Sequence, residues 1–548
     1  MHCRIQISTT KRKIESLQEE KMEIEEEERL QDLRSKATKL LLREDYKDSI
    51  ETYSQIISLC QDNIFKKTRD GPHLTKIQRT LCLAFSNRAE AWARLFQFSQ
   101  ALKDCEEALR IEKSHFKTLL CKGKILLSMN RYGSALECFK LANLDPEANE
   151  NCELVNGFLL KCKKLESLSR TGAFDVSDWV LSGFKGKTPE FAQYIGAVEI
   201  KKSEISGRGL FATKNVESGS LMFVTKAVAV DRAIVPEYCG ENAHLVIWKN
   251  FIDKVVQIVS KCNEVNFLIS NLSAGEDEGS LGVPEIGFFR PEADFSSCEK
   301  LDSGKMLSIL DVNSILEDAV SSKVLGKNAD YQGIGLWVLA SLINHSCDPN
   351  VRRLHIGDYV IVLASRDVKA GEELTFAYFD VLLPLSKRAE MAKNWGFVCK
   401  CKRCEYEDNL CCNQEMGELE TVLEKGHVDM MGSVVCRLEE GIRRWNVRGR
   451  GKGYLRASFW RAFSEIYGSD KMMRKWGRKV PSVESAVDSV VESVGSDERV
   501  MRVFLEGLKK SGGIMEMEKG MKLGRGVYGK VMKKQALKSL IQFGGNQE

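Results

Sequence analysis

The first third of the chain repeats one pattern of bulky and small apolar residues with a period of about 34 residues, a length typical of helical repeats. Phe98 recurs one period later as Tyr132, and Ala101 recurs as Ala135. Small residues at fixed positions let two helices approach closely, while bulky residues fill the space between them. A sustained period of this length therefore predicts stacked helical pairs, with a generic helical bundle as the alternative.

This pattern resembles the tetratricopeptide repeats. An earlier copy fits from Tyr46 onward, and we expect an inserted loop near residues 61 to 78 to separate it from the later copies. The sequence thus predicts a repeat domain over residues 29–165, preceded by a charged lead-in helix over residues 1–28. A coiled coil is not expected for the lead-in, because sustained apolar heptads are missing.

The resemblance implies that the repeats bind a peptide or protein in a concave groove. In the chaperone-binding kind, five side chains clamp the terminal carboxylates of heat-shock chaperones. Asn87 and Lys117 match two of these positions, Arg34 stands where the first Lys should be, Thr38 replaces an Asn and Cys121 replaces an Arg. A partly kept clamp loses much of its charge complementarity, so chaperone-tail binding is not expected.

After a linker predicted at residues 166–195, the pattern changes to short alternating apolar runs with glycine punctuation, beginning at Val198. Such runs predict short strands. One apolar run, residues 334–343, ends abruptly in a polar cluster over residues 344–350, which contains Asn, His, Cys, Asp and Pro. The cluster fits either a strand that runs into a polar loop or a ligand site, since Asn and His each offer hydrogen-bonding groups and Cys binds metal.

Four short motifs follow one another in the second part of the chain. They are GRGLFA at residues 207–212, SLINHSCDPN at 341–350, GEELTFAY at 371–378 and CKCKRC at 399–404. In this order they resemble the SET-domain protein lysine methyltransferases, in particular the SET-and-MYND branch. The resemblance covers roughly residues 196–404.

The expected fold class is multidomain α+β: helical repeats, a mostly-β SET domain, a zinc-bound tail and a C-terminal helical region. The SET domain is placed at residues 196–380, and an insertion at about 225–330 includes an amphipathic helix over 244–262. The zinc-bound post-SET segment is placed at residues 381–410. The MYND finger is expected to be absent, because the insertion region offers few cysteines, namely Cys239, Cys262 and Cys298.

The resemblance implies transfer of a methyl group from S-adenosylmethionine to the ε-amine of a lysine in a histone or non-histone protein. It makes Tyr378 the catalytic residue and lets Trp395 and Phe397 line the substrate channel. It places the cofactor among Arg208, Gly209, Leu210, Asn344, His345, Tyr378 and Phe397. Ala377 replaces an Asp that many SET enzymes carry before this Tyr, which bears on the rate.

The chemistry needs alignment and a dry channel more than an acid–base pair. Free lysine has a pKa of about 10.4, so the amine must lose its proton before it attacks. A narrow apolar channel disfavours the ammonium form and lowers that pKa. The alternative function is an adaptor whose SET fold is weakly active or inactive and whose repeats do the work; cofactor binding separates the two.

Three cysteines in CxCxxC spacing, Cys399, Cys401 and Cys404, indicate a zinc site that lacks one ligand. A structural zinc ion takes four ligands in a tetrahedron. The family resemblance supplies Cys347 as the fourth, with the Cys411–Cys412 pair as rivals. Zinc would then fix the tail beside the cofactor loop.

The C-terminal region, residues 411–548, is predicted to be helical and basic. Its last part, residues 441–548, holds 23 Lys or Arg against 11 Asp or Glu, which fits a solvated helical face. The dense basic loop at residues 448–453 has no interleaved aromatics, so direct nucleic-acid binding is not expected. Residues 524–531 match the glycine loop of kinases, but the stretch after them in this sequence is too short for a kinase catalytic loop, so we interpret the match as coincidental.

The distribution of apolar residues also bears on the compartment. Nothing approaches 18 consecutive apolar residues, so a membrane span is not expected. The segment from Met1 to Lys13 lacks the apolar core of a secretory signal. The 18 cysteines are scattered and are expected to be reduced apart from the metal cluster, which predicts a nuclear or cytoplasmic protein.

Overall fold

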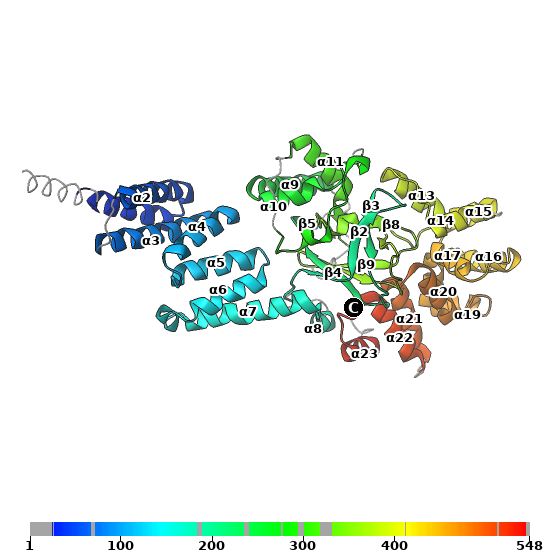
Figure 1. Ribbon diagram of the computed structural model, residues 1–548. Helices are drawn as coiled ribbons and strands as arrows, with labels where there is room; N and C mark the ends of the chain where they lie inside the picture. Colours follow the sequence, from blue (N-terminus) through cyan, green and yellow to red (C-terminus); the bar gives the residue numbers. More distant parts are fainter. Residues whose placement is uncertain are drawn as a thin grey trace, which may run out of the picture. The chain divides into compact units, whose positions relative to one another are not determined.

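The computed structural model describes residues 25, 27–66, 72–182, 189–234, 241–275, 278–293, 301–317, 331–410, 413–511 and 515–543. The chain forms two compact units, the first over residues 1–166 with 260–262 and the second over 167–259 with 263–548 (Figure 1). Most of the predicted lead-in helix, the Cys411–Cys412 pair, Cys239 and Cys298 lie outside the described residues.

The first unit consists of paired helices. They are α2 (Tyr46–Lys66), α3 (Pro72–Arg94), α4 (Phe98–Ile111), α5 (Phe116–Ser128), α6 (Tyr132–Ala142), the short 3-10 helix η1 (Pro146–Asn149) and α7 (Cys152–Thr171). Residues Glu44, Phe96 and Asn130 have positive φ angles of 65°, 60° and 61°, and each stands just before α2, α4 or α6. The same tight turn therefore precedes each of these helices, as the sequence period predicts for helical repeats.

Small and bulky residues fit together between the helices of this unit. A Cβ atom on Gly123 would lie 2.7 Å from the ring of Phe139, which itself stacks on Phe158 with ring centroids 4.8 Å apart. Ala101 and Ala135 are fully buried. The alternation of small and large residues in the sequence thus reports the packing of neighbouring helices.

The expectation of an inserted loop near residues 61 to 78 is wrong. Helix α2 continues to Lys66 and α3 begins at Pro72, so the extra residues mainly lengthen two helices. Asn63 is buried and Ile64 packs against the helical core, which keeps the last turn of α2 on the apolar face. Helix α7 likewise runs to Thr171, beyond the expected end of the repeats at residue 165.

The second unit is built on short strands. They are β1 (Tyr194–Ile195), β2 (Val198–Lys202), β3 (Arg208–Ala212), β4 (Leu221–Lys226), β5 (Val230–Ile234), β6 (Ile315–Leu316), β7 (Tyr331–Gly335), β8 (Asn344–His345), β9 (Val351–Ile356), β10 (Tyr359–Ala364) and β11 (Thr375–Phe376). Four small sheets have the orders β1-β4-β10-β9, β2-β3, β5-β7-β6 and β11-β8. The first three are antiparallel, whereas β8 and β11 pair in parallel, which joins two of the predicted motifs.

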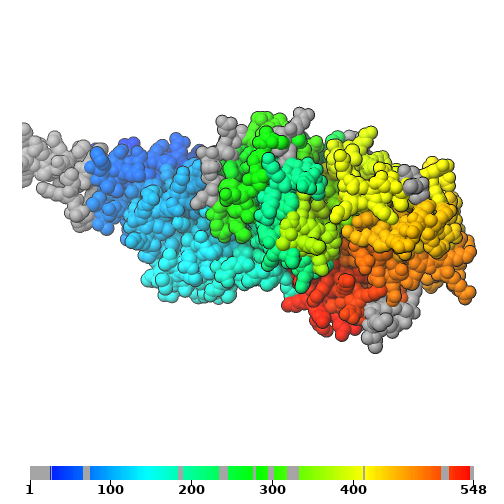
Figure 2. All heavy atoms as spheres, turned by 45° about the vertical axis from the view of Figure 1, so that its right-hand side comes forward, coloured from blue at the N-terminus to red at the C-terminus, as the bar shows by residue number. Residues whose placement is uncertain are grey.

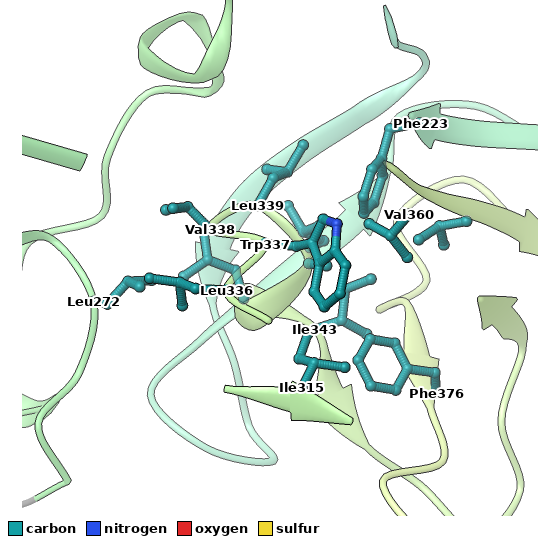
Figure 3. Close-up of a cluster of buried hydrophobic side chains, with 14 of the residues drawn as sticks. Phe223, Leu272, Ile315, Leu336, Trp337, Val338, Leu339, Ile343, Val360 and Phe376 are labelled. Carbon is teal, nitrogen blue, oxygen red and sulfur yellow. The ribbon is translucent and has the colours of Figure 1, made fainter. Parts of the chain in front are cut away.

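The core of this unit lies around Trp337, on which Ile315, Ile343 and Phe376 converge from separate segments (Figure 3). Trp337 is fully buried, and its indole N–H donates to the carbonyl of Asp358 at 3.1 Å. Of the two alternatives for this stretch, a strand over residues 334–343 that runs into a loop is wrong, because β7 ends at Gly335 and a 3-10 turn, η5 (Ala340–Leu342), precedes β8. The run is apolar because it passes through the core, where its residues are buried whatever their local geometry.

Helices cover this β-rich core on the side of the insertion. They are α9 (Glu241–Lys261), α10 (Asn263–Ser270), the 3-10 turns η3 (Glu278–Ser280) and η4 (Ile286–Phe289), and α11 (Ser303–Asn313). Helix α9 matches the amphipathic helix expected at residues 244–262 and buries Phe251 and Val255 completely. This confirms a mostly-β domain with an inserted helical segment.

The segment expected to be a linker also contains a helix, α8 (Ser177–Leu181). The N–H of Val176 donates to the carbonyl of Val531 at 2.9 Å, and the N–H of Lys533 donates to the hydroxyl of Ser177 at 2.9 Å. These bonds attach α8 to the C-terminal end of the second unit, so this part of the segment belongs to a folded unit.

The C-terminal region is helical, as predicted. Its elements are α13 (Leu385–Asn394), α14 (Lys402–Asp408), α15 (Asn413–Lys425), the 3-10 turn η6 (Val428–Met430), α16 (Met431–Arg444), α17 (Arg450–Ser458), α18 (Trp460–Gly468), α19 (Asp470–Trp476), α20 (Val483–Val494), α21 (Glu498–Ser511), α22 (Met515–Tyr528) and α23 (Lys534–Phe543). Figure 2 shows the C-terminal helices, orange to red, as one continuous surface with the green and yellow part of the second unit.

Two glycine-rich stretches are helical. The expectation of a basic loop at residues 448–453 is wrong, because helix α17 begins at Arg450. The glycines Gly451 and Gly453 of this helix allow Tyr406 and Ser489 to approach its main chain closely. The kinase-like stretch lies mostly in α22, where Gly524 packs on Leu537, so its glycines serve helix packing. Among the described helices, none combines the length and apolar character that crossing a membrane requires.

Candidate functional site

The side chain of Asn344, at the start of β8, brings two of the sequence motifs together. Its amide nitrogen lies 3.0 Å from the carbonyl oxygen of Ser206, 3.1 Å from that of Arg208 and 2.8 Å from Oε1 of Glu373. Asn344 therefore connects the loop before β3 to Glu373, which lies just before β11. Because β8 also pairs with β11, the three segments are held at one place.

The carboxylate of Glu373 leaves no space for a side chain at Gly209. The Ser203 hydroxyl donates to its carboxylate at 2.8 Å, and a Cβ atom on Gly209 would collide with the same carboxylate. Leu210 is completely buried in the core, and its carbonyl accepts from the N–H of Leu374 at 2.7 Å. Gly209 and Leu210 can therefore contribute only their main-chain groups to the binding of a ligand.

The guanidinium of Arg208 lies away from Asn344. It is buried and donates to the carbonyl oxygens of Asn271 at 2.8 Å and Gly282 at 3.2 Å, both in the insertion. Arg208 therefore fixes the insertion to β3 with its side chain, while its carbonyl oxygen lies beside Asn344.

His345 is buried between the tyrosine strand and the cysteine cluster. Its Nδ1 accepts from the N–H of Tyr378 at 3.0 Å, and its Nε2 lies 3.3 Å from Sγ of Cys347. Since Nδ1 accepts from a main-chain N–H, the ring proton of the neutral imidazole must be on Nε2 and can be donated to the sulfur. One ring thus connects Tyr378 to the cluster.

Tyr378 lies two residues after the end of β11 and lines a pocket. Its hydroxyl donates to the carbonyl oxygen of Ile343 at 2.9 Å, and burial raises the pKa of this phenol to about 12. The pocket holds about 360 Å³ of space including its open side. It is lined by Val312, Asn313, Ser314, Ile315, Leu316, Ala340, Ser341, Ile343, Arg353, Phe376, Tyr378 and Trp395.

The two aromatic residues predicted to line the substrate channel both lie near Tyr378, but only one of them lines the pocket. Trp395 lines the pocket, remains 39% exposed and has its ring 5.3 Å from that of Tyr378. Phe397 is not among the pocket-lining residues; its ring lies 5.3 Å from His345 and 6.1 Å from Tyr378. The structure therefore brings the predicted cofactor and channel residues into one neighbourhood, except for the side chain of Arg208, and only Trp395 of the two channel aromatics lines the pocket.

Four cysteines form a group that could hold a metal ion. The sulfur atoms of Cys347, Cys399, Cys401 and Cys404 all lie within 4.8 Å of one another, although Cys347 lies far upstream of the other three in sequence. Sulfur ligands at about 2.3 Å from a tetrahedral zinc ion would be about 3.8 Å apart, so a small contraction completes such a site. An all-thiolate, largely buried set of four fits zinc.

The surroundings stabilise negative charge on part of the cluster, since hydrogen bonds among the four cysteines lower the pKa of Cys399 and Cys401 and raise that of Cys347 and Cys404. Cys401 precedes helix α14, and its sulfur accepts from the N–H of Cys404 at 3.5 Å, where the positive end of the helix dipole stabilises negative charge. The buried guanidinium of Arg388 donates to the sulfur of Cys404 at 3.0 Å. Hydrogen bonding with Cys347 lowers the pKa of the Cys399 thiol to about 7.

A buried ion-pair cluster supports the cysteine loop from behind. Glu407 accepts from Arg388 at 2.5 Å and from Arg403 at 2.7 Å, and the side chains of all three are at most 3% exposed. Arg403 also donates to the carbonyl oxygens of Cys347 and Val381, at 3.2 and 2.7 Å. Removing one partner would leave a buried charge uncompensated, so the cluster is a rigid support.

Helix α17 of the C-terminal region holds the same loop through Asp348. This carboxylate is 7% exposed and accepts from Arg450 at 2.5 Å and from the hydroxyl of Tyr454 at 3.1 Å. Asp348 directly follows Cys347 in sequence. The position of the cysteine loop thus depends on residues that lie far downstream in the chain.

Sequence reasoning missed several residues of this neighbourhood. They are Ser203, Glu373, Asn350, Asp348, Arg388, Arg403, Glu407, Arg450 and Tyr454. Asn350 is 1% exposed, donates to the carbonyl of Glu373 at 2.7 Å and accepts from the N–H of Thr375 at 2.8 Å. Its place in the NHSCDPN motif and that of Glu373 in GEELTFAY could have marked them, whereas nothing local in the sequence marks Arg388 or Tyr454.

Comparison with known proteins agrees with this geometry. Residues 207–379 match the family model described as SET domain. A protein of Gibberella zeae described as a methyltransferase is 29% identical over 59% of this chain and 46% of its own length. The histone-lysine N-methyltransferase SMYD3 of Mus musculus is 40% identical over 26% of this chain and 32% of its own length.

These alignments leave more than half of each of the two relatives unmatched. Among solved structures, the TPR2B domain of yeast Sti1 in a complex with pHsp70 is 17% identical and covers 25% of this chain and 96% of its own, with a TM-score of 0.20. The SET domain of LSMT bound to lysine and AdoHcy is 13% identical and covers 67% and 91%, with a TM-score of 0.21. Scores this low carry no argument.

The conclusion about the family therefore stands on the matched residues and on the fold. The family model spans the three motifs from Gly207 to Tyr378, and the structure shows paired helical repeats before it and helices after it. The chain carries a SET domain that is similar in sequence to that of the histone-lysine N-methyltransferase SMYD3, and paired helical repeats precede it.

Proposed function

We propose that this protein transfers a methyl group from S-adenosylmethionine to the ε-amine of a lysine in a histone or non-histone protein. The observation that carries the proposal is the position of Tyr378. Its hydroxyl is fixed at one side of an apolar pocket, and its main chain is bonded to His345, beside Asn344 and the loop before β3. A SET domain implies this cofactor, and the relatives named above include a histone-lysine methyltransferase.

The residues present suit the cofactor. When bound, S-adenosylmethionine supplies a methyl group on a positively charged sulfur. The carbonyl oxygens of Ser206 and Arg208, the amide of Asn344 and the carboxylate of Glu373 form a polar cluster beside His345. We assign this cluster, with the main chain of Gly209 and Leu210 and the ring of Phe397, to cofactor binding.

Tyr378 positions groups and does not act as the base in this proposal. With a pKa of about 12, its phenol keeps its proton at neutral pH. Because the hydroxyl proton is donated to Ile343, the oxygen keeps its lone pairs available to accept from polarised C–H or N–H groups. The apolar wall of Ile315, Ile343 and Phe376 disfavours an ammonium ion, which helps the lysine reach the pocket as a neutral amine.

Zinc has a structural role in this proposal. Bound by Cys347, Cys399, Cys401 and Cys404, it would fix the segment that carries Trp395 and Phe397 next to the loop that carries His345. The helical repeats of the first unit would recruit the substrate or a partner protein through a bound peptide.

The test is methyl transfer from radiolabelled S-adenosylmethionine to a peptide or protein array. Wild type should label lysines, and Tyr378→Phe should lower kcat at least 10-fold with little change in cofactor affinity. Tyr467→Phe is the matched control, because its buried hydroxyl bonds to the carbonyl of Pro481 in another part of the second unit. No labelling and no cofactor binding by calorimetry would refute the proposal and favour the adaptor alternative.

A further inference from the structure

We propose that the helical repeats contain a second zinc site, formed by Cys82, Glu112 and His115. The ligand atoms of these three side chains all lie within 4.8 Å of one another. They come from three places: Cys82 from the middle of α3, Glu112 from the C-cap of α4 and His115 from the N-cap of α5. This inference concerns the first unit and does not depend on the methyl-transfer proposal.

Two of the ligands are held by one short turn. The N–H of His115 donates to the carbonyl oxygen of Glu112 at 3.3 Å, and the N–H of Glu112 donates to that of Ala108 at 3.0 Å. The turn between α4 and α5 therefore presents a carboxylate and an imidazole together. Little chain entropy remains to be lost when both bind one ion.

The third ligand comes from the preceding repeat. Cys82 is fully buried, and its sulfur lies 3.5 Å from the carbonyl of Ala108, which is also the acceptor at the end of α4. The thiol thus points at the end of α4, beside the Glu112–His115 turn. A metal ion there would link α3 to the α4–α5 turn.

A hydrogen bond orients the histidine ring. Nδ1 of His115 lies 2.7 Å from the hydroxyl of Thr118, a residue with no exposed surface. Metal-binding histidines commonly have the other ring nitrogen fixed by such a partner. Nε2 is then the nitrogen that remains for an ion.

The charges around the cluster act in both directions. Burial is the largest effect on His115 and lowers its pKa, and Lys117 acts in the same direction, whereas the carboxylates of Glu112, Glu147 and Asp145 raise it. Burial, helped by Glu112 and opposed by Arg79, raises the pKa of the Cys82 thiol to about 11. The nearby carboxylates would attract a divalent ion, and that ion must displace the proton of the Cys82 thiol when it binds.

The ligand types select the metal. Thiolate, imidazole and carboxylate together are ligands that zinc takes, at about 2.0 to 2.3 Å, and water completes the tetrahedron. Ligand atoms around such an ion would be about 3.5 Å apart, and the three atoms lie within 4.8 Å of one another, so closing the cluster requires movements of at most about 1 Å. Rotation of the Glu112 side chain can supply most of that movement.

The experiment measures zinc per chain in the full-length protein, by mass spectrometry after reconstitution with zinc and gel filtration. Cys82→Ser and His115→Ala should each contain one zinc fewer than wild type. Glu112→Gln, which leaves the buried core unchanged, should weaken the second zinc at least 10-fold in competition with a chromophoric chelator. Cys60→Ser is the matched control, because Cys60 is equally buried in the same helical core and is not in the cluster.

Cobalt provides a second readout. A Co²⁺-loaded chain should lose one thiolate-to-cobalt charge-transfer contribution in Cys82→Ser and none in Cys60→Ser. Circular dichroism confirms that each variant keeps its helices. Zinc content equal to wild type in His115→Ala and Glu112→Gln, or an equal loss in Cys60→Ser, would overturn the proposal.

Discussion

Replacement of Tyr454 by Phe tests whether helix α17 positions the cysteine loop. The change removes one hydroxyl, which donates to the buried carboxylate of Asp348 at 3.1 Å, and keeps the ring. A hydrogen bond to a charged group contributes about 1.5–3 kcal/mol, and the distance points to the lower half of that range. We therefore expect the second unit to lose about 1.5–2 kcal/mol of its free energy of unfolding.

The variant should also alter the site itself. Burial raises the pKa of Asp348, whereas Arg450 and the Tyr454 hydroxyl lower it, so removing the hydroxyl leaves Arg450 as the main partner of a poorly solvated carboxylate. Because Asp348 follows Cys347, a shift of this residue moves the zinc loop. Faster release of zinc to a chelator and weaker binding of S-adenosylmethionine should accompany the loss of stability.

Urea unfolding followed by tryptophan fluorescence reports on the right part of the chain, since all the tryptophans except Trp92 belong to the second unit. Tyr467→Phe is the control: it removes a buried hydroxyl bonded at 2.8 Å to the neutral carbonyl of Pro481. That variant should lose about 1 kcal/mol and keep normal zinc release. Equal zinc release and equal cofactor affinity in the two variants would refute a positioning role for α17.

Three further outcomes are expected. Gly209→Ala places a Cβ atom against the Glu373 carboxylate and should weaken cofactor binding, measured by calorimetry, at least 10-fold. The control variant Gly417→Ala has open space around it in helix α15 and should stabilise the protein by up to about 1 kcal/mol. Unchanged cofactor affinity in Gly209→Ala would contradict this account. Cys347→Ser should remove one zinc per chain in elemental analysis, and an unaltered zinc content would reject Cys347 as a ligand. The pKa of Tyr378 is raised to about 12, so its contribution to stability should be complete below pH 10 and be lost as the pH rises toward 12. Denaturation of wild type and Tyr378→Phe across this range checks the last prediction, which a difference already changing at pH 8 would contradict.

The local patterns of the sequence were sufficient for the repeats and for the order of the SET motifs. The spacing of Phe98 and Tyr132 marks the starts of α4 and α6, because a helical repeat is a local unit that contacts its neighbours at fixed positions. Amino-acid composition was misleading about secondary structure where tertiary packing decides the local conformation. Apolar residues at 336–343 are buried around Trp337 without forming a strand, and the glycines of residues 448–453 belong to a helix start that packs against other segments.

The sequence by itself determined which residue types the site contains: an Asn-His-Ser-Cys loop, a tyrosine after a short strand and three closely spaced cysteines. Only the tertiary structure decided what surrounds them. Asp348 and Tyr454 are 106 residues apart, and Asn344 and Arg208 are 136 residues apart, yet each pair is hydrogen-bonded. Contacts over such separations depend on how whole segments pack, and no local pattern records them. Arg403 and Glu407 have the i, i+4 spacing of a helical pair, but the approach of Arg388 to Glu407 and of Cys82 to Glu112 and His115 became visible only in the folded chain.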